Sequence, residues 1–117
     1  MYAGRPEEAI PLYQKAIRLN PFGPSSLYRQ YGIVLRDMGR FEESVSQLKK
    51  AIQIAPDNFT AHINLAATYS MMGRETEARA EAAEVLRINP KFSLDYYAKN
   101  VGYTGKFVNL LRNAGLK

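Results

Sequence analysis

A segment that begins with glycine-arginine and ends with proline occurs three times in this 117-residue chain. The three copies run from Gly4 to Pro21, from Gly39 to Pro56 and from Gly73 to Pro90, so their glycines are 35 and 34 residues apart. A nearly fixed period of this length is typical of stacked repeat proteins, in which each repeat is one small helical or strand-containing unit. The period therefore predicts an array of similar units rather than a single irregular core.

Apolar residues between these markers recur at the three- and four-residue spacing of a helix buried on one side. The pattern predicts helices over residues 7–20, 27–38, 41–54, 59–72 and 75–88. Gly39 and Gly73 suit the left-handed position that follows a helix. The prolines that end each copy stop the helix before them, because the residue preceding proline avoids the helical region. The chain is predicted to be all-α.

Polar residues at the predicted helix starts suggest which side chains cap them. We expect Ser25 or Ser26 to cap the second helix, and Asp57 or Asn58 to cap the fourth. Gly32 lies within the second helix, where the absence of a side chain allows the next helix to approach closely. After Pro90 the repeat pattern ends. Short helices are predicted from a Ser93 cap to about residue 99 and over residues 107–113, with interruptions at Gly102 and Gly105.

The length suits one small domain. We divide it into a half repeat (1–24), two repeats (25–58 and 59–92) and C-terminal capping helices (93–117). In this division the start of the chain, Met1 to Gly4, is the end of a helix whose remainder is missing.

The repeat resembles the tetratricopeptide repeat family. The family's frame is an aromatic, a Leu-Gly pair, a tyrosine, an alanine, a phenylalanine and a proline at set offsets. The positions of this frame hold Tyr28, Tyr31-Gly32, Leu35, Ser44, Leu48 and Pro56 in the first complete repeat, and His62, Leu65-Ala66, Tyr69, Ala78, Ala82 and Pro90 in the second. Three of them depart from the family: Ser44 replaces the alanine, Ala82 the large residue and His62 the aromatic. The half repeat contributes Ala9, Tyr13 and Pro21. The resemblance implies a right-handed superhelix of antiparallel helix pairs, with a concave groove lined by the first helix of each pair.

The groove-facing positions are those left after the core face is removed. On the two groove helices they are Ser26, Arg29, Gln30, Ile33, Arg36, Asp37, Thr60, Ile63, Asn64, Ala67, Ser70 and Met71. The resemblance implies that a peptide or protein partner docks here, because Arg29 and Asn64 correspond to positions where some members hold a peptide's C-terminal carboxylate. Ile33 and Ile63 depart from that clamp, which has polar groups in their places. Arginines in a groove can form paired hydrogen bonds with a carboxylate.

The composition excludes several kinds of chemistry. Without cysteine the chain has no disulfide and no thiolate metal site. Its single histidine, His62, takes the place of a packing aromatic and is expected in the core, with no serine or acid placed beside it. We therefore predict no catalytic residues, no metal and no cofactor, and a protein that is not an enzyme.

The net charge of +5 is concentrated in the tail: residues 91–117 carry +4 and residues 1–90 carry +1. No aromatic residues are interleaved with these basic ones in a nucleic-acid-binding pattern, so we interpret the tail as a solvated end and do not expect a nucleic-acid partner. The longest uncharged stretch, residues 59–73, is too short and polar to cross a bilayer. No signal-peptide pattern opens the chain. A cytoplasmic location without membrane insertion is expected.

Two alternatives to a groove-binding module remain open. A repeat array without its first helix exposes an apolar end face, so self-association through Leu12, Tyr13 and Ala16 is the first alternative. The second comes from the tail, which resembles the end of the repeat region in bacterial class III adenylate or guanylate cyclases. The residues that carry this second resemblance are Asn89-Pro90-Lys91-Phe92-Ser93-Leu94, Tyr97-Ala98, Leu110-Leu111-Arg112 and Ala114-Gly115-Leu116. It implies a regulatory segment, a C-terminal fragment of a larger signalling protein.

Overall fold

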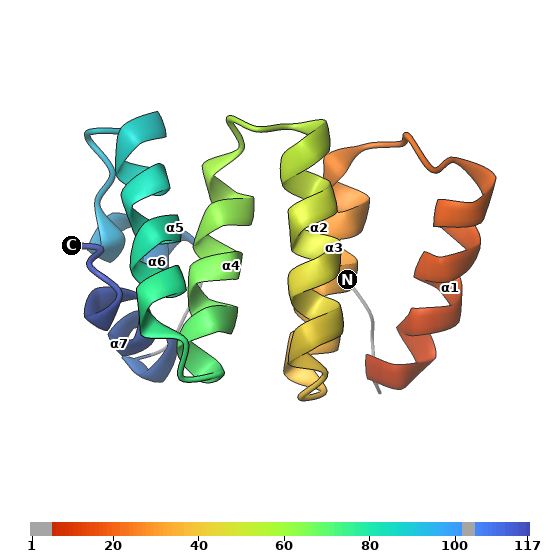
Figure 1. The fold of residues 1–117 in the computed structure, drawn as a ribbon, viewed down its shortest axis with the longest axis horizontal. Coiled ribbons are helices and arrows are strands. Elements are labelled where there is room, and N and C mark those ends of the chain that lie inside the picture. Colours follow the sequence, from red (N-terminus) through yellow and green to blue (C-terminus); the bar gives the residue numbers. More distant parts are fainter. Residues whose placement is uncertain (1–5, 102–104) are drawn as a thin grey trace. The chain divides into compact units, whose positions relative to one another are not determined.

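The structure, a computed structural model, describes residues 6–101 and 105–117 and divides into two compact units, Met1–Pro56 and Asp57–Lys117. All regular elements within the described residues are α-helices, which confirms the predicted fold class (Figure 1). Unit 1 contains α1 (Pro6–Leu19), α2 (Ser25–Asp37) and α3 (Phe41–Ile54). Unit 2 contains α4 (Phe59–Met71), α5 (Glu75–Ile88), α6 (Leu94–Val101) and α7 (Gly105–Asn113).

The core of unit 1 lies between α2 and its two neighbours, α1 and α3. Gly32 makes the contact with α3 close: a Cβ atom at this position would lie 2.8 Å from Leu48 Cγ. The Ser44 hydroxyl donates a 2.6 Å hydrogen bond to the Gly32 carbonyl across the same contact. On the other side, the ring of Tyr13 in α1 stacks on Tyr31 with centroids 5.7 Å apart. The predicted role of Gly32 as a point of close approach is confirmed.

Gly39 and Gly73 end α2 and α4 in the same way. Their φ angles are +79° and +76°, in the left-handed region that glycine adopts without steric cost. The next amide, of Arg40 or Arg74, then donates at 2.9 Å to a carbonyl five residues earlier in the helix. This pattern is the Schellman motif, and it satisfies carbonyl groups that the last helical turn would otherwise leave unpaired.

The N-terminal caps follow the prediction in one repeat and not in the other. Asn58 caps α4, where its side-chain oxygen accepts from the Thr60 amide at 3.1 Å. The expected cap at Ser25 or Ser26 is wrong: α2 begins at Ser25 itself, the preceding residue is Pro24, and no side chain caps this helix. The extended backbone of Pro24 already ends the loop, so both serines fall inside the first turn.

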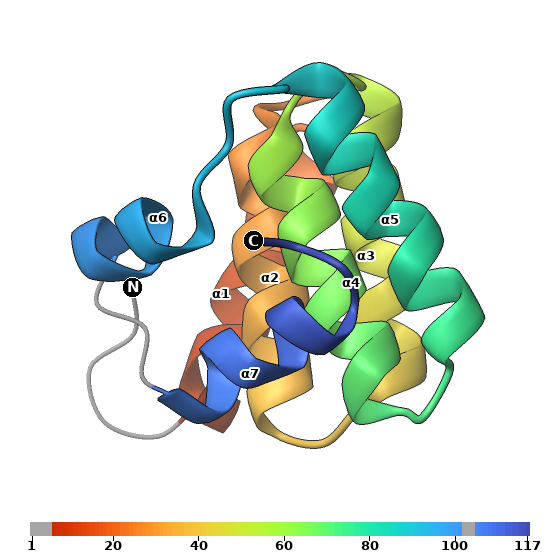
Figure 2. The same cartoon turned by 90° about the vertical axis from the view of Figure 1, so that its left-hand side faces the viewer.

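Unit 2 repeats the antiparallel pair as α4 and α5 and adds the C-terminal helices. Ser93 caps α6 through a 3.3 Å bond to the Tyr96 amide, as predicted. The chain then returns, so that α7 packs on α4, and the Lys117 carbonyl accepts from the Leu94 amide at 2.6 Å. Figure 2 shows α7 beside the lower half of α4, with α6 further to the side.

The remaining predictions fall partly outside the described part of the chain. The helix remnant at Met1 to Gly4 and the interruption at Gly102 lie outside it. Gly105 is the first residue of α7 rather than a break before it, so this helix begins two residues earlier than predicted. Among the helices described, none combines the length and apolarity that a bilayer crossing requires.

Candidate functional site

The predicted groove positions of unit 1 lie along α2. Arg29, Ile33 and Arg36 are spaced by four and three residues and therefore share one side of the helix. The Arg29 Nε atom is buried and, among the residues that the structure describes, has no hydrogen-bond partner. Arg36 Nη2 lies 3.5 Å from the Asp37 carboxylate. Gln30 and Asp37 are exposed beside this row.

The predicted groove positions of unit 2 are mostly covered. Ile63, Asn64 and Ala67 on α4 have no solvent-exposed surface, Ser70 is half-buried and Met71 is 37% exposed. The Asn64 side-chain amide donates to the Thr60 carbonyl one turn earlier at 2.9 Å. Because α2 and α4 belong to different units, a joint groove formed by both helices stays a prediction.

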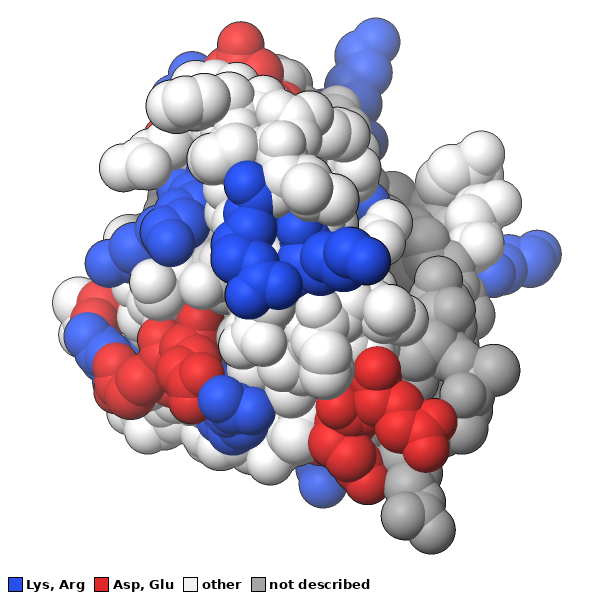
Figure 3. Space-filling view, turned by 90° about the vertical axis from the view of Figure 1, so that its right-hand side faces the viewer, with Lys and Arg blue, Asp and Glu red and all other residues white. Residues whose placement is uncertain are grey.

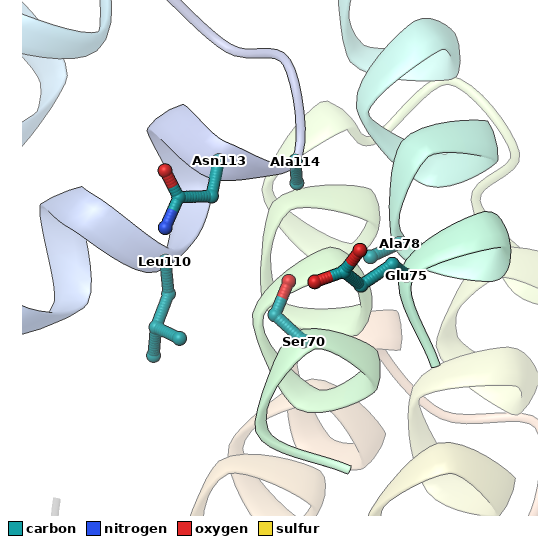
Figure 4. Close-up of a pocket in the computed structure, with 6 residues that line it drawn as sticks. All are labelled: Ser70, Glu75, Ala78, Leu110, Asn113 and Ala114. Carbon is teal, nitrogen blue, oxygen red and sulfur yellow. The ribbon is translucent and has the colours of Figure 1, made fainter. Parts of the chain in front are cut away.

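A small cavity lies where α7 packs beside the end of α4 and the start of α5. It has a volume of about 60 Å³ and is lined by Ser70, Glu75, Ala78, Leu110, Asn113 and Ala114 (Figure 4). Sites for small organic ligands usually have volumes of roughly 300–1,000 Å³. This cavity is therefore a packing defect at a helix contact, and we assign it no small-molecule ligand.

The histidine is buried in the α4–α5 interface, as the sequence predicts, but it has an acidic neighbour that the sequence analysis missed. His62 Nδ1 lies 2.7 Å from Glu81 Oε1, and the two side chains are 7% and 21% exposed. The prediction that no acid lies beside His62 is therefore wrong. The position equivalent to Glu81 in the preceding repeat, 34 residues earlier, is Gln47. Alignment of the two repeats could therefore have indicated a polar residue facing His62.

Exposed ion pairs recur at the starts of the second helices. Arg40 binds Glu43, and Arg74 binds Glu77 at the equivalent position of the next repeat. The hydrogen bond from Arg40 lowers the pKa of Glu43 and raises the pKa of Arg40. Near the end of α5 the hydrogen bond from Arg87 lowers the pKa of Glu84, with a smaller contribution from nearby His62. These groups lie on helix surfaces, and such exposed pairs contribute little to stability.

Acidic side chains and the single histidine do not gather into a metal site: no cluster of three potential ligands occurs among the described residues. The face of unit 1 that carries α1 shows a group of basic side chains near its centre and acidic groups below it, with basic side chains directly beside some of the acidic ones (Figure 3). Three large apolar side chains are exposed in this helix and the loop after it, Leu12 (69%), Leu19 (76%) and Phe22 (91%).

Three family models match the sequence. The model described as TPR repeat matches residues 32–73, and two described as Tetratricopeptide repeat match residues 63–89 and 1–22. Among curated proteins, the O-mannosyl-transferase Tmtc3 of Drosophila melanogaster is 28% identical over 85% of this chain, and the TPR repeat-containing thioredoxin TTL4 of Arabidopsis thaliana is 36% identical over 65% of it. The aligned region is 11% of either relative, so this chain spans about a tenth of their length.

Solved structures agree with these matches. YrrB, described as a TPR protein with an unusual peptide-binding site, has a TM-score of 0.72 and 26% identity, with 81% of this chain and 48% of YrrB covered. A mutant form of MamA has a TM-score of 0.66 and 28% identity, with 69% of this chain and 58% of that one covered. The 34-residue period, the helix pairs closed by left-handed glycines and these matches lead to one conclusion: residues 1–22 and 32–89 of this chain are tetratricopeptide repeats.

Proposed function

We propose that the chain is a non-catalytic protein-interaction module of the cytoplasm that binds an exposed segment of a partner protein on its groove side. Repeats of this family provide a surface rather than a reactive centre. The peptide-binding site in the description of YrrB, a structural relative at 26% identity, supports a peptide as the ligand.

The row on α2 suggests the chemistry of that segment, and the half-buried Arg29, whose Nε has no partner among the described residues, is the observation that carries this proposal. The Nε itself has no accessible surface, so a ligand carboxylate would form its charge-assisted bond with the rest of the guanidinium group. Ile33 lies one turn further along the same side and supplies an apolar contact. The expected ligand therefore combines an acidic group with an apolar anchor.

A peptide array tests this assignment. The probes are nine-residue peptides that pair one glutamate or aspartate with one leucine, isoleucine or phenylalanine, and matched peptides with glutamine or asparagine in place of the acid. We expect Arg29→Glu to weaken binding of the acidic peptides by about 10-fold or more, since a hydrogen bond to a charged group contributes roughly 1.5–3 kcal/mol. Arg18→Glu changes an exposed arginine on α1 of the same unit and should leave affinity unchanged.

Equal losses in Arg29→Glu and Arg18→Glu would show that only net charge matters and would refute the site on α2. A wild-type chain that binds neither member of each peptide pair would refute acidic-peptide recognition itself.

Self-association is the second candidate, and the apolar surface of α1 favours it. Leu12 and Phe22 are exposed, whereas the equivalent positions of the later repeats hold polar residues, Gln47 and Glu81 for the first and Asp57 and Lys91 for the second. An exposed apolar patch that has polar counterparts in sister repeats suggests a surface that another protein surface covers.

Sedimentation equilibrium over a 100-fold concentration range tests this second candidate. If α1 is a self-association surface, the mean mass rises with concentration, and Leu12→Glu shifts the midpoint of association by about 10-fold or more because it puts a charge into the contact. Gln47→Glu, at the equivalent position of α3, should leave the midpoint unchanged. A monomer mass at every concentration would exclude self-association by this face.

A regulatory segment of a nucleotide cyclase is a third candidate, which rests on the tail resemblance alone. The family matches end at residue 89, which is where the tail residues that carry this resemblance begin. An upstream cyclase domain in the native reading frame would support this assignment.

A further inference from the structure

The face of α4 predicted to bind a ligand already carries a helix of the same unit. Ser70 on α4 lines a cavity together with Leu110 and Asn113 on α7, so α7 lies on the Ser70 side of α4. Ile63 and Ala67 precede Ser70 by seven and three residues and therefore share its side of the helix. Both are fully buried. The C-terminal helix thus lies on the C-terminal half of α4, around Ser70, on the side where the sequence predicts a ligand (Figure 2).

The side chains of α7 are arranged as in a helix that docks through one apolar side. Phe107, Leu110, Leu111 and Ala114 recur at three- and four-residue spacing; Leu111 is fully buried, Ala114 is 4% exposed, and the other two are half-buried. The opposite side carries exposed Lys106, Asn109 and Arg112. Helix-in-groove recognition uses this pattern of anchors at i, i+3, i+4 and i+7.

Three features of α7 favour its detachment. The helix has nine residues, and helices shorter than about 12 residues have marginal stability without a partner. Its packing against α4 and α5 leaves the cavity of about 60 Å³. Arg112 bonds Asp95 of α6 at 3.1 Å, but the two side chains are 50% and 86% exposed. An exposed pair of this kind contributes roughly 0–1 kcal/mol.

We propose that the Ser70 side of the C-terminal half of α4 is a docking site for an amphipathic helix and that α7 is its resident occupant. An external helix with Leu-Leu anchors and a polar outer side binds there by displacing α7. This inference rests on the proposed interaction function and adds to it the class of partner for unit 2, a helix rather than an extended peptide. It also adds a form of regulation, because binding requires that the resident helix leave.

The test uses the full chain and, as the probe, a fluorescein-labelled peptide of residues 105–117. In the wild type the tethered α7 competes at an effective concentration that reaches the millimolar range for short linkers, so the peptide binds weakly. Leu111→Asp puts a charge at the fully buried anchor and detaches α7, and we expect the peptide to bind this variant at least 10-fold more tightly. Asn109→Asp, on the exposed side of α7, should behave as the wild type. A probe peptide that itself carries Leu111→Asp should not bind.

Equal affinity of the peptide for the wild type and for Leu111→Asp would overturn the proposal, as would equal binding of the altered probe. A second measurement covers the case in which Leu111→Asp unfolds unit 2. In the wild type, a saturating concentration of the peptide should speed amide hydrogen exchange in α7 while α5 stays protected. Saturated binding without faster exchange in α7 would place the peptide elsewhere.

The two binding proposals fail separately. In one outcome, Arg29→Glu abolishes binding of the acidic peptides, but the 105–117 peptide binds equally with and without Leu111→Asp. This outcome supports the interaction function and refutes the helix site. The reverse result keeps the helix site on α4 and removes the acidic-peptide site on α2.

Discussion

Gly32→Ala is expected to destabilise unit 1 by about 1–3 kcal/mol, the usual range for overpacking a filled core. The new methyl group would lie 2.8 Å from Leu48 Cγ and 3.3 Å from the Ser44 carbonyl oxygen. Leu48 is fully buried, and packed protein interiors contain few voids into which such a side chain can move. Alanine is favoured over glycine in a helix interior by roughly 1 kcal/mol, so the clash must exceed this gain. Urea unfolding followed by circular dichroism at 222 nm measures the loss.

A second substitution identifies the cause. Leu48→Ala alone should cost about 2–5 kcal/mol, the usual range for truncating a buried leucine. In this background Gly32→Ala no longer meets the leucine side chain, and we expect it to be neutral or stabilising by up to about 1 kcal/mol. The sign of its effect therefore reverses. Gly105→Ala, where an added Cβ meets no atom within 4 Å, is the control. A Gly32→Ala loss of the same size in both backgrounds would contradict steric contact with Leu48 as the cause.

The repeat frame explains why the first five helices were predicted with boundaries close to those observed. α3 begins and ends at the predicted residues, as does α5. Their boundaries are local: a glycine with positive φ precedes each helix closely, and a proline follows each one closely. Such signals need no knowledge of distant contacts, because they act through the backbone of the residue itself and its neighbours.

The C-terminal helices show where this reasoning stops. The apolar side of α7 was visible in the sequence as Phe107, Leu110 and Leu111, but its docking position was not. The tail has no counterpart in the earlier repeats, so no period relates α7 to α4. The predicted groove side of α4 was for the same reason taken as open, and the structure buries Ile63, Asn64 and Ala67. Burial of this kind depends on long-range packing, which the local pattern does not encode.

The polar partner of His62 was missed for a different reason. The position of His62 was interpreted from the aromatic residues at equivalent positions of other repeats, such as Tyr28, and the histidine was assigned their packing role. This role is confirmed by its burial. An imidazole also carries two ring nitrogens that need partners in a buried site, and Glu81 bonds one of them. The prediction rested on the shape of the histidine side chain and left out its polarity.

This buried pair gives the second large expected effect, since removing one member of such a pair is more harmful than removing both. His62→Phe restores the aromatic residue that the repeat favours but leaves the Glu81 carboxylate, 21% exposed, without its 2.7 Å partner. We expect a loss of about 1–3 kcal/mol, below the 3–5 kcal/mol typical of a fully buried charge. Urea unfolding at pH 7 gives the value.

The double variant should reverse this loss. His62→Phe with Glu81→Leu replaces the pair by apolar groups, and Leu12 at the position equivalent to Glu81 in the first repeat is the natural precedent for leucine here. Replacing both partners of a buried polar contact by apolar groups of similar shape can be nearly neutral or stabilising, so the double variant should be at least as stable as the wild type. Ala83→Leu, at an exposed position of α5, controls for the added leucine. If the losses of His62→Phe and of Glu81→Leu, each measured alone, simply add in the double variant, His62 and Glu81 are not energetically coupled.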